Sequence, residues 1–119
     1  MTCISKLAGR GVRQIMMFHI AGDMPDLHSL HLEVLDSDIW AVTGCRLAYL
    51  PHDALRQLCH ACPRIADELW RLTLVDASIY RESVVNVAQR QAPSRMTHLF
   101  CEMMLRARAA GLAQGNTCP

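Results

Sequence analysis

The stretch that decides the fold is RIADELWRLTLVDASIYRESVVNVAQRQ, residues 64–91. It contains neither Gly nor Pro, and its apolar residues recur at near-helical spacing: Ile65, Leu69, Leu72, Val75, Ile79, Val84 and Val87. This spacing is typical of an amphipathic α-helix, and Pro63 suits its first turn. At about 1.5 Å per residue such a helix would be roughly 40 Å long. We therefore expect its apolar stripe to meet the same stripe of a second copy, as in a coiled coil, and to form a homodimer.

Two shorter helices are expected on either side of the long one. Pro93 interrupts the helical pattern, and Ser94 is a favourable N-cap for a further helix over Arg95–Ala110. Gly111 stands where a glycine commonly ends a helix. A short helix is predicted over residues 51–60, because the apolar period changes there from that of a strand to that of a helix.

The first fifty residues contain short runs that are typical of strands. We predict strands over Arg13–Ile20, Asp38–Val42 and Cys45–Leu50, the last two separated by a tight turn at Thr43-Gly44. Gly22 can adopt a positive φ, so it is expected to turn the chain where the first of these strands leaves the sheet.

Composition narrows the class of protein. The chain has 119 residues, enough for one small domain, and a net charge of +1, which lacks the basic excess typical of a nucleic-acid-binding surface. No apolar run approaches the ~18 residues of a membrane span, and the N-terminus has no secretory apolar region. The six cysteines are therefore expected to be reduced thiols in a cytoplasmic protein. Because no catalytic motif is present, we expect that the protein is not an enzyme and binds no cofactor.

Three stretches of the chain are similar to those of known proteins: CRLAYLPHDALRQL at 45–58, PRIADELWR at 63–71 and SRMTHLFCEMMLRARAAG at 94–111. Together they resemble the Crp/Fnr family of bacterial transcription regulators. The resemblance covers most of residues 10–112 and implies a sensor domain with a β-roll of the cyclic-nucleotide-binding type, a dimerisation helix and a winged helix-turn-helix that binds DNA.

The chain departs from the family at both ends. Residues 1–50 supply only about the second half of a β-roll, and the chain stops where the winged helix-turn-helix should begin. The resemblance therefore implies a truncated regulator in which DNA binding belongs to full-length relatives. The expected divisions are a partial β-roll with a short helix (1–61), the dimerisation helix (62–92), a helix leading to the missing domain (93–112) and a disordered tail (113–119).

The resemblance also suggests where a ligand would bind. The phosphate-binding cassette of the family follows a Gly-Asp pair, here Gly22-Asp23, but Asp26-Leu27 replaces its Gly-Glu pair and no arginine follows until Arg46. A cyclic phosphate needs a compensating cation, so we expect a small-molecule effector other than cAMP. Tyr80 and Arg81 lie midway along the long helix, in the stretch that faces the sensor pocket in the family. Arg81 could instead be a surface ion-pair residue.

One alternative belongs to a different functional class. Cys59, Cys62, His98 and Cys101 form two pairs, each with two residues between its members, and four such side chains can make a tetrahedral zinc site or a redox centre. Ordinary packing of small residues at helix junctions explains them better, so no metal is expected in the main interpretation. That interpretation is an α+β fold: a partial antiparallel β-roll, a short helix, a long dimerisation helix and one further helix.

Overall fold

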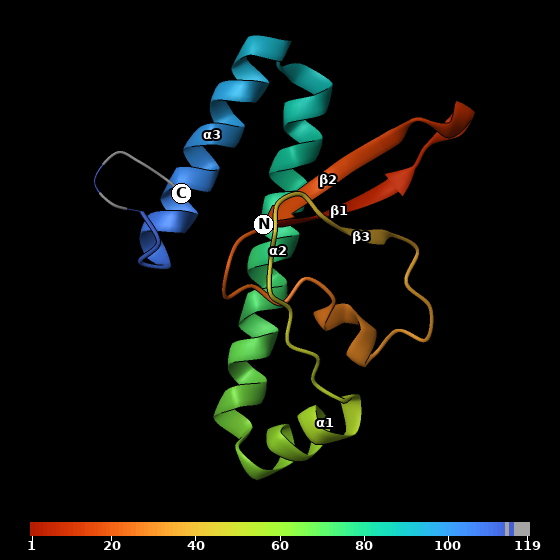
Figure 1. The fold of residues 1–119 in the computed structure, drawn as a ribbon, viewed down its shortest axis with the longest axis vertical. Coiled ribbons are helices and arrows are strands. Elements are labelled where there is room, and N and C mark those ends of the chain that lie inside the picture. Colours follow the sequence, from red (N-terminus) through yellow and green to blue (C-terminus); the bar gives the residue numbers. More distant parts are fainter. Residues whose placement is uncertain (114, 116–119) are drawn as a thin grey trace.

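The chain forms a three-stranded antiparallel sheet followed by three helices (Figure 1). The computed structural model describes residues 1–113 and 115. This architecture confirms the α+β class and the order of a short, a long and a further helix. The strands of residues 1–50 form this small sheet.

The central strand of the sheet is one that the sequence analysis did not predict. The strands are β1 (Thr2–Leu7), β2 (Arg13–His19) and β3 (Asp38–Ala41), and their order in the sheet is β2-β1-β3. A hairpin joins β1 to β2 through the 3₁₀ turn η1 (Gly9–Gly11). Pairing of β1 with β3 then brings together residues that are 33 to 39 positions apart, so only tertiary structure reveals it.

The predicted strand over Cys45–Leu50 is wrong. After β3 the chain turns at Val42 and Thr43, whose amides both donate to the Met1 carbonyl oxygen. Residues 44–51 then run toward α1 without helix, strand, turn or bend. The physical reason is that this segment pairs with none of β1, β2 and β3, and a strand needs a hydrogen-bonded neighbour as well as an alternating pattern.

The three helices follow the expected plan with shifted boundaries. They are α1 (His52–Ala61), α2 (Pro63–Gln89) and α3 (Ala92–Ala109). α3 begins earlier than predicted, with Gln91 rather than Ser94 as its N-cap, because Pro93 fits in the first turn, where a missing N–H costs nothing. Gly111 follows α3 with φ of +70°, as a terminating glycine should. The predicted disordered tail, 113–119, lies largely outside the described residues.

Little apolar surface is buried within the chain. Among the described residues the buried apolar set is small: Cys3, Ile4, Met17, Leu30, Leu55 and Ala107. α1 packs on the beginning of α2, and β2 together with the 3₁₀ turn η2 (Leu27–Leu30) packs along its middle. α3 folds back beside the far end of α2 (Figure 1). The sheet and η2 thus lie against one side of α2, and this arrangement positions the candidate site.

Candidate functional site

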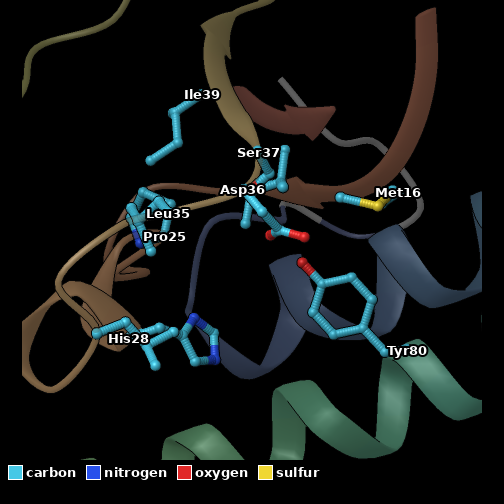
Figure 2. A pocket seen from close by; sticks show the side chains of 10 residues that line it. Met16, Pro25, His28, Leu35, Asp36, Ser37, Ile39 and Tyr80 are labelled. Carbon is cyan, nitrogen blue, oxygen red and sulfur yellow. The ribbon is translucent and has the colours of Figure 1, made fainter. Parts of the chain in front are cut away.

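A cavity of about 250 Å³ opens between the sheet, the loop that follows β2, and α2. Its lining combines one residue from each strand with loop residues and one aromatic ring: Ile4, Met16, Pro25, His28, Leu32, Leu35, Asp36, Ser37, Ile39 and Tyr80. Figure 2 shows the Tyr80 ring rising from α2 toward the loop residues on the opposite side. The cavity is slightly smaller than the ~300–1,000 Å³ usual for drug-sized ligands, so it suits a small molecule.

The polar side of this cavity centres on Asp36 and Tyr80, whose carboxylate and hydroxyl point toward one another (Figure 2). Lys6 donates a hydrogen bond to Asp36 Oδ2 at 2.5 Å, and this bond with the lysine charge lowers the pKa of Asp36. Burial raises the pKa of Tyr80, and the negative charges of Asp76 and Asp36 raise it further. Tyr80 therefore presents a protonated hydroxyl, a hydrogen-bond donor, at neutral pH.

A second feature is an ionic cluster where β2 ends, centred on Asp23. Arg106 from α3 donates to Asp23 Oδ2 at 2.6 Å and to the carbonyl oxygen of Phe18 at 2.8 Å. The Ile20 amide also donates to Asp23 Oδ2, at 2.8 Å. His19 is only 3% exposed, and its Nδ1 lies 3.5 Å from the same oxygen. One carboxylate oxygen thus joins the end of β2 to the last turns of α3.

The cluster shifts the pKa values of its two aspartates in opposite directions. Burial raises the pKa of Asp23, but the His19 ring, the Ile20 amide and the Arg106 charge outweigh it, so the net pKa lies below its ordinary value. Burial raises the pKa of Asp76 on α2, and electrostatic interactions with His19 and Arg106 offset only part of that rise. Both carboxylates border a small cavity of about 40 Å³, large enough for water.

The structure separates the five residues that were expected to bind a ligand. Gly22 adopts φ of +98° and turns the chain as predicted, and both Gly22 and Asp23 line the small cavity. Tyr80 lines the large cavity. Asp26 is exposed beside η2, and Arg81 donates to Ser78 Oγ at 2.7 Å on its own helix. Neither Asp26 nor Arg81 lines either cavity.

The predicted dimer stripe on α2 is partly covered by the chain itself. Ile65, Leu69 and Ile79 are half-buried, whereas the remaining members are exposed: Leu72 by 38%, Val75 by 43%, Val84 by 68% and Val87 by 62%. Further exposed apolar side chains on α2 went unnoticed in the sequence: Trp70, Leu74 and Val85. Trp70 and Leu74 are four positions apart, a helical spacing from which these two could have been predicted.

The alternative zinc site does not form within the described residues. Cys59 and Cys62 lie at the junction of α1 and α2, whereas His98 and Cys101 lie on α3, near the other end of α2 (Figure 1). Instead of a metal, His98 faces the Asn86 side chain at 2.9 Å and Glu82 at 3.5 Å. Nowhere in residues 1–113 and 115 do three His, Cys, Asp or Glu side chains gather in a way that could hold a metal ion.

Sequence reasoning missed Arg106, the residue that organises the ionic cluster. It is 83 positions from Asp23, and nothing local distinguishes it from the other arginines of the helical half. Its position on α3 decides its role, because a cation at that turn reaches both the Phe18 carbonyl oxygen and the Asp23 carboxylate.

Comparison with known proteins returned no match. No family model, no curated protein and no solved structure is similar to this chain at a significant level. None of α1, α2 and α3, nor any other helix of the described chain, is long and apolar enough to cross a membrane.

Proposed function

We propose that this chain is the sensing and dimerising segment of a Crp/Fnr-like transcription regulator. The resemblance of residues 45–58, 63–71 and 94–111 to that family motivates the proposal. In it, two copies associate through α2, and a small molecule in the cavity beside Tyr80 changes how the two helices meet. DNA binding would belong to the winged helix-turn-helix of full-length relatives.

The observation that carries the proposal is the exposure of apolar side chains along α2. This 27-residue helix buries none of its residues in the single chain. Its exposed apolar side chains include Val84 and Val87 on the predicted stripe and Trp70 on another face of the helix. Burying one Val or Leu side chain is worth about 1.5–3 kcal/mol, so a partner that covers several of them gains substantial free energy. Exposed apolar patches of this kind mark interaction surfaces.

The position of the cavity supports the sensing part of the proposal. Tyr80 belongs to α2, so a ligand in the large cavity would contact the proposed dimerisation helix directly. Asp76, one turn earlier on α2, borders the small cavity together with Asp23. Arg106 connects Asp23 to α3. A shift of α2 would therefore act on α3 through neighbouring side chains.

The experiment is a measurement of mass in solution by sedimentation over a range of protein concentrations. Wild-type protein is expected to associate through α2, and the double variant Val84→Lys/Val87→Lys is expected to lose that interface. Gln89→Lys is the control for an added lysine, because it places one positive charge, where the double variant places two, at an exposed position on roughly the opposite side of α2.

Two results would contradict the proposal. One is wild-type protein that stays folded and sediments as a single chain at high concentration. The other is an equal effect of Gln89→Lys and Val84→Lys/Val87→Lys, because association would then not depend on the apolar stripe. Circular dichroism of each variant verifies that α2 is intact.

A further inference from the structure

The segment between β3 and α1, residues 44–50, has unused backbone hydrogen-bonding groups. None of its N–H or C=O groups bonds to another backbone group within the described chain. It contains no turn or bend and no proline, and Pro51 follows it as the N-cap of α1. A stretched backbone with free donors and acceptors is a template for pairing with another strand.

The side chains of this segment also lack cover. Leu47 is 52% exposed, Tyr49 87% and Leu50 49%. Along an extended chain Cys45, Leu47 and Tyr49 fall on one face, and Arg46, Ala48 and Leu50 on the other. Natural edge strands are usually protected by lysines, prolines or bulges, but the single charge here is Arg46. The segment therefore has both the backbone and the side chains of a strand that lacks its partner.

We propose that residues 46–50 pair with the same residues of a second copy, antiparallel and about a twofold axis at Ala48. A symmetric contact of this kind places each residue opposite one of the same face. Leu47 of each copy lies opposite Tyr49 of the other, so four apolar side chains share one face. On the other face the aliphatic part of Arg46 lies over Leu50 of the partner.

Repulsion between the two Arg46 residues favours a twofold axis at Ala48 over one at Leu47. With the axis at Ala48 the two Arg46 residues are four positions apart along the ribbon, about 13 Å, beyond the Debye length of about 8 Å at physiological salt. An axis at Leu47 would bring them within two positions on the same face, about 7 Å along the ribbon, and like charges there repel. Pairing with a second copy about an axis at Ala48 thus places the apolar side chains together and keeps the two arginines apart.

This contact is separate from the helix interface of the proposed function. A chain with two different twofold contacts builds a tetramer or a longer assembly, whereas a chain with one builds a dimer. Removing either contact alone is therefore expected to leave dimers, and removing both is expected to leave single chains. The two proposals can consequently fail independently.

The test combines amide hydrogen exchange of residues 44–50 with solution mass. Leu47→Pro and Ala48→Pro are made separately, because alternate residues donate along a strand and one of the two must remove a ladder bond. Neither replacement removes a backbone hydrogen bond of the single chain. Ala48→Thr is the control, since it keeps the N–H and favours a strand.

In wild-type protein the exchange of this segment is expected to slow by roughly tenfold or more as concentration rises, and at least one proline variant is expected to lose this effect. Val84→Lys/Val87→Lys is expected to retain it, and Ala48→Thr likewise. Exchange that stays fast at every concentration would overturn the inference. So would protection that does not depend on concentration, because it would indicate a partner within the same chain.

Discussion

Replacement of Arg106 by Met tests whether the ionic cluster holds α3 to the sheet. Met keeps most of the aliphatic length of the side chain and removes the guanidinium group. The wild-type Arg106 side chain is 18% exposed, and its guanidinium group makes three contacts: the Phe18 carbonyl oxygen at 2.8 Å, Asp23 at 2.6 Å and Glu102 at 3.4 Å. Asp23 is 28% exposed, so both partners are mostly removed from water.

The expected cost follows from these contacts. Each well-formed hydrogen bond to a charged group contributes about 1.5–3 kcal/mol, and the bonds to Phe18 and Asp23 qualify by distance. Removing one partner of a buried ion pair costs about 3–5 kcal/mol, because the other charge is left uncompensated. Here Asp23 keeps the Ile20 amide and some access to water. We therefore expect Arg106→Met to lower the free energy of unfolding by about 2–4 kcal/mol.

The assay is urea unfolding followed by circular dichroism, at one protein concentration for all variants because association stabilises by mass action. With a slope of about 1–3 kcal/mol per molar urea, the midpoint should fall by roughly 1–2 M. Arg95→Met is the matched control, since it removes an exposed arginine from the same helix and should change stability by less than about 0.5 kcal/mol. Equal midpoints for Arg106→Met and Arg95→Met would refute the reasoning.

Three further substitutions test the turn and the two cavities. Asp76→Asn should stabilise the chain at neutral pH. The pKa of Asp76 in the folded protein is raised above its ordinary 3.8, so the stability of the wild-type protein falls as pH rises through that folded pKa. Urea midpoints measured across this pH range should show the fall in the wild-type protein but not in the variant. Gly22→Ala should cost about 1–2 kcal/mol because φ is +98°, whereas Gly44→Ala, where φ is not positive and the new Cβ also meets open space, should be neutral by the same measurement. The ultraviolet titration of phenolate in the wild-type protein should contain a step above the ordinary tyrosine pKa of 10.0, and Tyr80→Phe should remove that step. The same variant should lose less stability than the wild-type protein as pH rises through the raised pKa of Tyr80.

The predictable elements are those whose own sequence contains the signal. The apolar period and the absence of Gly and Pro predicted α2, and its observed bounds, Pro63–Gln89, differ from the prediction by only a few residues. The strand Arg13–Ile20 was predicted from its local apolar run and is observed as Arg13–His19. Gly22 turns the chain as expected, because few other residues tolerate its φ.

The elements that were missed or wrong depend on distant partners. β1 contains Thr2, Cys3 and Ser5 beside Ile4, a mixed pattern that becomes a central strand because β2 and β3 pair with its two edges. Residues 45–50 show the better alternation but have no strand beside them. A strand needs an available edge as well as a pattern, and single-sequence reasoning sees only the pattern. The same reason hid the pairing of Asp23 with Arg106.

Electrostatics narrows the effector that the proposed function needs. The large cavity is lined by Asp36 and contains no arginine or lysine, and Lys6 is already bonded to Asp36. Arg106, the cation beside Gly22-Asp23, is shared among Phe18, Asp23 and Glu102. A cyclic phosphate would therefore enter without a cation of its own, or would have to separate Arg106 from Asp23 at a cost similar to that of Arg106→Met. A neutral or cationic molecule that accepts a hydrogen bond from Tyr80 meets no such cost, so a ligand of that kind is the one we expect this cavity to bind.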